Sequence, residues 1–384
     1  MKKIFYLIIA TVFMLSCSTK EAKVTIENTS NFDRLTELVE IPIDSIKDKK
    51  SVTDSLVYHV QTEDGEIIPS QVTYDRKIIF QPQLKANETK SFIITTGDPQ
   101  DFEAKTYGRF ITERKDDFAW ENDRVAFRIY GPALIEIDGP SNGIDIWYKR
   151  TNDLIIDKWY KDDLAGVASY HDDHGEGLDD YKVGRTLGAG AMAPYVNNKL
   201  WLNENFVSEE LLDNGPLRTT FKLTYKDMDV DGKTVAENRT ISLDAGSQFS
   251  KIVQAYTIKE PMTVAAGIVK RETGDSIIAS VDKGYIVYTE PKTDKVSGIY
   301  LGLVFPQGIN ESKTDTYDVL NPKSNKKDTY SHVLALATQQ PNIPVTYYTG
   351  YGWSQFGFPT VADFEKYIQN FSEELKQPLI IKYK

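Results

Sequence analysis

The chain has 384 residues, of which 40% are hydrophobic and 11% aromatic, and its formal net charge at pH 7 is −11. This length suffices for two domains, or for one large β domain with a small companion. The negative charge argues against nucleic acid or an anionic membrane surface as a partner, because both need a basic face. An acidic small ligand stays open, because the field of a binding site is set locally.

The N-terminus has the layout of a bacterial export signal. Two lysines precede an apolar run over residues 4–15, which is too short to span a bilayer as a helix. The run ends at Leu15-Ser16-Cys17, which resembles a lipobox, and Cys17 is the only cysteine of the chain. We therefore expect a signal peptide over residues 1–16 and lipidation of Cys17. The protein would then be an exported lipoprotein of the periplasm or outer membrane that touches the membrane only through its lipid anchor. An ordinary signal peptide is the alternative.

Strand patterns dominate the rest of the chain. After a lipidated tether at 17–21, residues 22–97 alternate and are rich in Val, Ile, Thr and Tyr, which predicts a small antiparallel β-sandwich domain. Strand patterns continue through residues 98–384, which predicts a large two-sheet sandwich or barrel. Helical patterns occur at 154–164 and at 360–377, the latter starting with a threonine suited to capping. The predicted fold class is all-β.

Two motifs resemble ligand-binding loops, but the residues around them do not support binding. GAGAMA at 188–193 matches a relaxed dinucleotide fingerprint, but no buried strand precedes it and Pro194 interrupts any helix after it. DMDVDGKTVAEN at 227–238 opens like a calcium loop, but its twelfth position is Asn238 rather than glutamate. A hairpin turn on Asp231-Gly232 is the better interpretation.

Residues 170–195, YHDDHGEGLDDYKVGRTLGAGAMAPY, are too polar for a core and too acidic for a plain turn. His171 and His174 could bind a divalent metal, since their spacing places two imidazoles on one side of a helical turn. The carboxylates that could complete its shell are Asp172, Asp173, Glu176 and Asp179. However, Gly175 and Gly177 oppose a helix here, so no metal site is assigned. A solvated acidic loop is another open interpretation.

The third interpretation is that the stretch forms one side of a catalytic site. His171, His174, Tyr181 and Arg185 offer the imidazole, phenol and guanidinium groups that proton transfer at a sugar requires. Aromatic side chains, which stack on pyranose rings, flank the stretch. They are Trp147, Tyr148, Trp159, Tyr160, Trp201 and Trp353. Glycines at 184, 188 and 190 would let the backbone approach a ligand.

The sequence resembles a known family. The blocks that carry the resemblance are YHDDHGEGLDDYKVGRTLGAGAMAPY, LDNGPLRTTFKLTY, ENDRVAFRIYGP, GIDIWYKR and YYTGYGWSQFGFP. They are similar to those of secreted lipoproteins of polysaccharide-degrading bacteria, a family long described as a domain of unknown function. Its better-understood members resemble oligosaccharide dehydratases of ulvan breakdown, which act on a terminal glucuronate or iduronate linked to 3-sulfated rhamnose. The resemblance also implies a galactose-mutarotase-like β-supersandwich for the large domain, and an acidic, sulfated, uronate-containing oligosaccharide as partner.

The chemistry that the resemblance implies is a β-elimination that leaves a 4,5-unsaturated uronate. A base removes the C5 proton, cations neutralise the carboxylate, and an acid protonates the departing 4-hydroxyl. We assign His171 or His174 as the base. Tyr181 is the acid, or shares the proton transfer with the second histidine. Arg185 or Lys182 neutralises the charge of the uronate carboxylate. The remaining candidate substrate-binding residues are Glu176, Arg150, Trp147 and Trp201. A polysaccharide lyase, a glycoside hydrolase and a non-catalytic glycan-binding lipoprotein are the alternatives.

Overall fold

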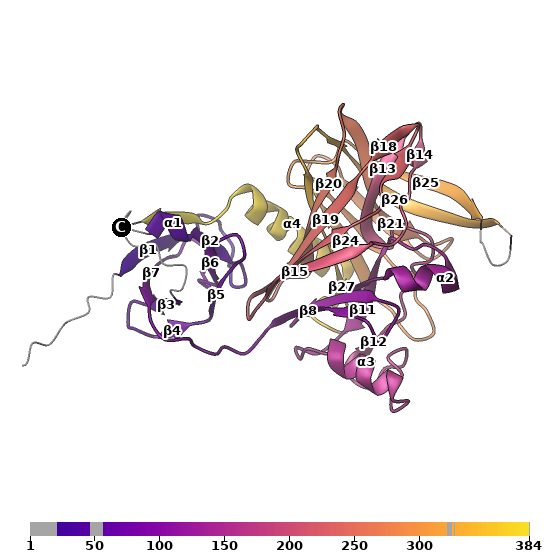
Figure 1. The fold of residues 1–384 in the computed structure, drawn as a ribbon. Coiled ribbons are helices and arrows are strands. Elements are labelled where there is room, and N and C mark those ends of the chain that lie inside the picture. The colour runs from indigo at the N-terminus through magenta and orange to yellow at the C-terminus, as the bar shows by residue number, and fades with distance from the viewer. Residues whose placement is uncertain (1–20, 47–56, 321–324, 326, 384) are drawn as a thin grey trace, which may run out of the picture.

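The computed structural model describes residues 21–46, 57–320, 325 and 327–383. They form a small and a large β body, with a helix between them (Figure 1). The predicted signal peptide and Cys17 lie outside the described residues. Among the residues that are described, no helix combines the length and the apolar character that crossing a membrane would need.

The small domain packs two antiparallel sheets around an apolar core. One sheet has the strand order β28 (Ile380–Tyr383), β1 (Ala22–Glu27), β7 (Thr89–Thr96), β3 (Tyr58–Thr62) and β4 (Ile67–Ile68). The other has the order β2 (Val39–Pro42), β6 (Lys77–Phe80) and β5 (Ser70–Val72), and the short helix α1 (Ile43–Ile46) follows β2. Val24 and Ile26, and likewise Val39 and Ile41, are buried two positions apart, because alternate strand side chains face the same side.

One edge of the small domain comes from the end of the chain. In β28, Tyr383 pairs with Val24 and Ile380 pairs with Glu27, so residues 380–383 complete the sheet that residues 22–97 begin. Figure 1 shows the C-terminal end beside β1.

Among the described residues, the large domain contains three large sheets, besides a two-stranded hairpin described below. The first has the order β12 (Gly177–Leu178), β11 (Ile144–Lys149), β10 (Ala126–Ile129), β9 (Asp117–Asn122) and β8 (Thr106–Ile111). The second has the order β14 (Lys199–Leu200), β13 (Ala189–Val196), β21 (Met262–Lys270), β26 (Lys327–Gln339) and β25 (Glu311–Leu320). The third has the order β15 (Ser208–Asn214), β16 (Arg218–Thr224), β19 (Glu237–Asp244), β20 (Phe249–Tyr256), β27 (Val345–Trp353), β24 (Ile299–Val304), β23 (Tyr285–Thr289) and β22 (Ser276–Ser280).

The main core draws on all three of these sheets and includes Trp120, Phe221, Ile268 and Trp353. Strand β19 buries every second residue, as expected for a strand with one face on the core. The fold class is therefore the predicted one, an all-β chain with a small sandwich followed by a large supersandwich.

One predicted local feature is confirmed. The hairpin β17 (Met228–Val230) and β18 (Lys233–Val235) turns on Asp231 and Gly232, both with positive φ, as the sequence predicted. The glycine motif at 188–193 leads into strand β13.

Helices cover the outside of the large domain. Helix α3 (Ile156–Leu164) packs Trp159 and Tyr160 against the outer face of the β8–β12 sheet. Helix α4 (Val361–Lys376) buries Phe364 and Ile368 against β23 and β24. Both correspond to the predicted helical segments. The short elements η1 (Pro132–Leu134) and α2 (Ile135–Asp138) lie between β10 and β11.

Candidate functional site

The polar stretch 170–185 runs along the edge of the β11–β12 pair. Gly177 has a φ of +121°, and a Cβ there would lie 1.8 Å from the carbonyl oxygen of Tyr148. A Cβ at Gly188 would lie 2.1 Å from the carbonyl oxygen of Ile144. At these positions glycine therefore permits close packing of one backbone segment on another. Gly188, which we had expected to admit a ligand, serves the fold instead.

The two histidines of the stretch have different partners. The Nδ1 atom of His171 lies 3.0 Å from the carbonyl oxygen of Asp179 and 3.6 Å from its Oδ2 atom. The Nε2 atom of His174 lies 3.1 Å from the carbonyl oxygen of Ser169. Since a carbonyl oxygen only accepts, Nδ1 of His171 carries the proton and its Nε2 keeps a lone pair.

Asp179 belongs to a buried group of charges beneath His171. The Arg128 Nη2 atom lies 2.8 Å from the Asp179 carboxylate and 2.5 Å from the Asp145 carboxylate. The Tyr130 hydroxyl donates to Asp145 at 3.1 Å. Burial raises the pKa of Asp145, and the Arg128 charge opposes this only in part. These contacts fix Asp179, and through it the imidazole ring of His171.

Segment 290–298, between β23 and β24, holds the polar stretch from the outside. Lys295 Nζ donates to the carbonyl oxygen of His171 at 2.8 Å. The hydroxyl of Thr293 donates to the Asp180 carboxylate at 3.1 Å. This segment therefore contacts both the histidine end and the aspartate end of the stretch.

A cavity of about 400 Å³ opens between β11, the polar stretch, the end of β21 and segment 290–298. We call it the Arg271 pocket. Its charged and phenolic lining residues are Tyr148, Asp180, Lys182, Arg271, Glu272 and Glu290. The volume is within the range of small-molecule sites, and both charge signs are present.

Arg271 is anchored from several sides. Its Nε donates to Glu290 at 3.1 Å, its Nη1 donates to the carbonyl oxygen of Lys182 at 2.9 Å, and its guanidinium lies 5.0 Å from the centre of the Tyr181 ring. Within the described residues its Nη2 makes no hydrogen bond. A fixed guanidinium with a spare donor suits an anionic ligand.

Tyr181 and Glu290 keep unused hydrogen-bonding capacity next to Arg271. The buried Tyr181 hydroxyl and the Oε1 atom of Glu290 have no hydrogen-bond partner in the described part of the chain. Burial, followed by the charge of Glu290, raises the pKa of Tyr181 well above its usual value. Burial also raises the pKa of Glu290, although Arg271 opposes the shift. Such perturbed groups at a cavity are typical of functional sites.

The other predicted site residues are dispersed. Arg185 donates to the carbonyl oxygen of Leu320 at 2.5 Å, on the β25–β26 hairpin. Arg150 lies 2.9 Å from Asp173, and Glu176 lies 2.6 Å from Lys158. His174 and Glu176 line a separate, much smaller cavity of about 30 Å³. Of the predicted residues, Lys182 lines the Arg271 pocket and Tyr181 lies under its arginine.

The two predicted stacking tryptophans also lie apart. Trp147 is 1% exposed and stacks on Trp159 and Tyr170 in the layer beneath α3. It serves this core and presents no face to a sugar, because the neighbouring rings cover it. Trp201 is half-buried and lines a different cavity, near β14 and β17.

The described part of the chain does not assemble a set of ligands for the metal considered at the His171/His174 stretch. Among the described residues, no group of three or more His, Cys, Asp or Glu side chains is placed to hold an ion. Asp172 and Asp173, two of its expected ligands, pair with Lys295 and Arg150.

The residues at the centre of the pocket were not among those predicted from the sequence. Arg271 and Glu290 stand at the ends of β21 and β23 and meet only because β21 and β23 end close together. Tyr148 was noted only as a flanking aromatic residue. The available signal was the run Lys270-Arg271-Glu272 directly after an apolar strand, which places charges at a strand end.

The fold and this pocket define a two-domain, all-β protein with an arginine-centred polar cavity at the edge of its larger domain. The chain belongs to the family described as "Domain of unknown function (DUF4861)", which matches residues 26–381. It is 33% identical over 396 residues to "Uncharacterized protein P7" of Formosa agariphila, a match that covers 97% of each chain.

Two solved structures are similar to this chain. A protein in the glycosyl hydrolase family 38 from Enterococcus faecalis matches with a TM-score of 0.51 and 10% identity, over 95% of this chain and 47% of that one. An alpha-mannosidase from Enterococcus faecalis V583 matches with a TM-score of 0.45 and 9% identity, over 95% of this chain and 46% of that one. The chain thus spans about half the length of these structures, and the first similarity shows the fold alone.

Proposed function

We propose that the protein is an oligosaccharide dehydratase. It binds an acidic oligosaccharide and removes water from a glucuronate or iduronate at the non-reducing end, next to 3-sulfated rhamnose, as in ulvan breakdown. The product is a 4,5-unsaturated uronate. The observation that carries this proposal is the anchored Arg271 guanidinium in a cavity of about 400 Å³, beside a glutamate and phenols with raised pKa values.

Each group in the pocket has a role in the elimination. Arg271 Nη2 and Lys182 bind the uronate carboxylate, where negative charge accumulates when the C5–H bond breaks. Glu290 accepts the C5 proton, since a carboxylate with a raised pKa is a stronger base. The electron pair of that bond forms the C4=C5 double bond and the C4–O bond breaks. The leaving hydroxyl takes a proton and departs as water.

Tyr148 is the acid that we assign to this last step. Burial, followed by the charge of Glu290, raises the pKa of Tyr148 well above its usual value, so its hydroxyl keeps its proton and can donate it. Tyr148 lines the pocket, whereas the hydroxyl of Tyr181 is enclosed beneath Arg271. We therefore assign the role of acid to Tyr148 rather than to Tyr181, the residue predicted from the sequence.

Two similarities support a carbohydrate substrate. The motifs of the polar stretch resemble those of oligosaccharide dehydratases, and the fold is shared with a protein in the glycosyl hydrolase family 38. Neither similarity specifies the reaction, so the pocket chemistry must be tested directly.

Mass spectrometry of a uronate-capped, sulfated oligosaccharide incubated with the protein provides the test. We expect loss of one water without fragmentation, together with the absorbance of a conjugated uronate. Unsaturated shorter products would identify a polysaccharide lyase instead, and saturated shorter products a glycoside hydrolase. An unchanged substrate that still binds would identify a glycan-binding lipoprotein. A parallel assay with EDTA tests the divalent metal considered for the His171/His174 stretch.

Variants locate the reaction. Glu290→Gln should lower kcat by about 10²-fold or more, because the amide cannot accept the proton. Arg271→Lys should raise KM as well, because it loses the guanidinium fork. Glu272→Gln is the matched control, since this exposed carboxylate lines the same pocket but, among the described residues, forms no ion pair with the Arg271 guanidinium. If His171→Ala abolishes turnover while Glu290→Gln retains it, the active site lies at the histidine stretch instead.

We also propose that the protein is exported and anchored through a lipid on Cys17, in the periplasm or at the outer membrane. The lipobox-like sequence supports this proposal. The wild-type protein expressed in its host should incorporate radiolabelled palmitate and sediment with membranes, while Cys17→Ser should do neither. A wild-type protein that stays unlabelled would refute the anchor.

A further inference from the structure

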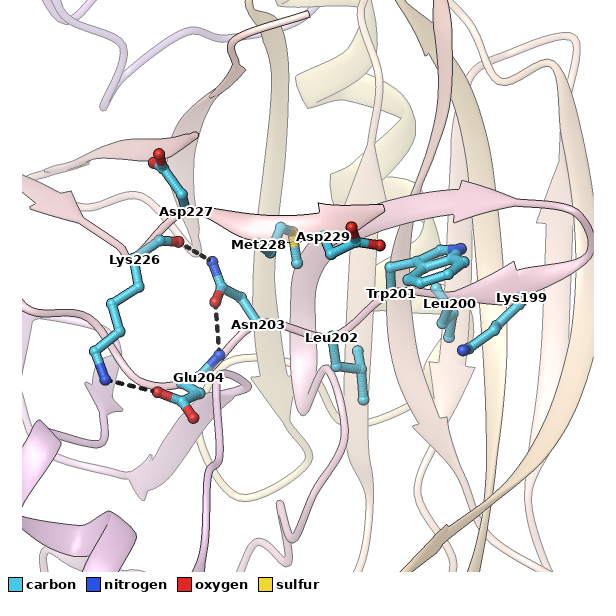
Figure 2. A pocket seen from close by; sticks show the side chains of 10 residues that line it. All are labelled: Lys199, Leu200, Trp201, Leu202, Asn203, Glu204, Lys226, Asp227, Met228 and Asp229. Carbon is cyan, nitrogen blue, oxygen red and sulfur yellow. Dashed lines mark hydrogen bonds and ion pairs between the residues drawn. The ribbon is translucent and has the colours of Figure 1, made fainter. Parts of the chain in front are cut away.

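A second cavity, of about 530 Å³, lies between residues 199–204 and the start of the β17–β18 hairpin (Figure 2). We call it the Trp201 groove. The side chains used in the argument are Lys199, Trp201, Glu204, Lys226, Asp227 and Asp229. Figure 2 shows Trp201 with Lys199 at one end of the groove and Glu204 with Lys226 at the other.

Trp201 forms a fixed aromatic platform. Its Nε1 donates to the carbonyl oxygen of Val196 at 3.2 Å, and the ring packs partly against the main core. The Nζ atom of Lys199 lies 4.0 Å from the ring centre. Lys199 is exposed and its stem is flexible, so moving it aside loses only a weak, solvent-exposed cation–π contact. A ligand can therefore take its place over the indole.

The charges of the groove select against an anionic ligand. Lys226 is paired with Glu204 at 3.0 Å. Asp227 and Asp229 are exposed and form no ion pair within the described residues. Asp229 accepts one hydrogen bond, from the Gly232 amide at 3.0 Å, and keeps acceptor capacity. The carboxylates thus exceed the lysines, which repels acidic sugars and favours the hydroxyl groups of neutral ones.

We propose that the Trp201 groove binds a neutral pyranose residue of a polysaccharide chain. An indole face stacks on the apolar face of a pyranose, and carboxylates next to it accept hydrogen bonds from its hydroxyls. The choice of a sugar as ligand rests on the proposed function, but binding at the groove requires no chemistry in the Arg271 pocket.

The groove and the Arg271 pocket lie at opposite ends of β13. At one end, the Val269 amide, two residues before Arg271, donates to the carbonyl oxygen of Gly188. At the other end, Val196 accepts from Trp201. The intervening strand has eight residues, and at about 3.3 Å per residue the two sites are roughly 25 Å apart. Only a chain of several sugars can therefore reach both.

Calorimetry and saturation-transfer NMR with the full-length protein test the groove. The probes are the methyl glycosides of a neutral hexose and of a 6-deoxyhexose, with methyl glucuronoside as the acidic comparison, and a long and a short uronate-containing oligosaccharide. We expect the neutral glycosides to contact Trp201. Trp201→Ala should weaken binding of the long oligosaccharide about tenfold and leave that of the short one unchanged.

The Trp201 ring also packs on the core, so Trp201→Ala could lose binding through misfolding. Two further variants distinguish this effect from a loss of ligand contacts. Asp227→Asn changes an exposed groove carboxylate and should weaken neutral-glycoside binding, while Trp201→Phe should restore part of what Trp201→Ala loses. Asp282→Asn, an exposed carboxylate outside both cavities, is the control and should bind as wild type does. Unchanged binding in Trp201→Ala and Asp227→Asn overturns the inference.

The test separates this inference from the proposed function. If neutral glycosides bind in a Trp201-dependent manner while no uronate loses water, the proposed reaction is wrong and the groove stands. If uronates lose water but wild-type protein binds no neutral glycoside, the groove inference is wrong.

Discussion

Glu121 and Lys149 illustrate how single residues support the site without touching it. Their side chains are fully buried, and the Lys149 Nζ atom on β11 lies 2.9 Å from the Glu121 carboxylate on β9, across the intervening strand β10. Glu121 also accepts the backbone amides of Ile155 and Ile156, each at 2.8 Å, at the start of α3. The pair thus ties the helix that covers the Arg128 cluster to the sheet that carries Tyr148.

Replacing Lys149 by methionine should destabilise the protein by about 3–5 kcal/mol, because Glu121 would remain buried without its counter-charge. Urea unfolding measures this. Glu121→Gln in the same background should recover part of the loss. Lys295→Met is the matched control: its pair with Asp172 is exposed, so its removal should leave the urea midpoint close to that of wild type. Equal losses in the two single variants would contradict this account.

At the residue scale, the sequence identified a polar stretch but not the contacts that make it a site. Tyr181 and Lys182 could be singled out because they stand among charged neighbours. The contact between Arg271 and Tyr181 could not be predicted, because it depends on where β21 ends relative to the edge of another sheet. Trp147 looked suited to stacking, but nothing local reveals that α3 and Tyr170 cover it.

At the element scale, regular patterns were readable and irregular ones were not. Helix α4 begins at the predicted cap: Asp363 donates its amide to the Thr360 hydroxyl, and the Thr360 amide donates back to the Asp363 carboxylate. Strand β19 shows the expected alternation. The segment from 151 to 200 has few such patterns, since it makes its contacts through buried ion pairs and close backbone packing.

The end of α4 faces the small domain. Arg34, which is 2% exposed, donates to the carbonyl oxygens of Glu374 and Gln377 at 3.2 and 2.7 Å and pairs with Glu37. It therefore satisfies helix carbonyls that would otherwise lack partners. Burial, followed by the charge of Glu37, raises the pKa of Glu374 to about 8.

This raised pKa predicts a pH effect on stability. The unfolded chain releases the Glu374 proton near pH 4.3, about the normal glutamate value. The folded protein keeps it to about pH 8, so stability falls as pH rises through this range. Other buried carboxylates with raised pKa values, such as Asp145, also contribute to the fall, so Glu374→Gln should reduce it. Above pH 8 the variant should exceed wild type by about 1–2 kcal/mol, a value reduced for partial exposure.

Urea unfolding at a series of pH values measures the difference. Glu373→Gln, on the exposed side of the same turn, is the control and should follow the wild-type curve. A wild-type stability that is flat between pH 5 and pH 8 would show that Glu374 ionises normally.

At the scale of the whole molecule, polar contacts connect the two domains. Arg218 on β16 lies 2.6 Å from Glu40 of the small domain, and Gln71 accepts the amides of Leu217 and Arg218 at 3.0 and 2.9 Å. The sequence indicated two domains from strand spacing, but not these contacts, because each joins residues more than a hundred positions apart.

The pairing of β28 with β1 has a consequence for how the protein is made. The ribosome synthesises the chain from its N-terminal end, so β1 emerges well before its partner β28. Until then β1 has only β7 beside it, and one edge of the small sheet is open. The small domain, although first in the chain, is thus the last to be completed, and a premature stop anywhere downstream leaves it with an unpaired strand.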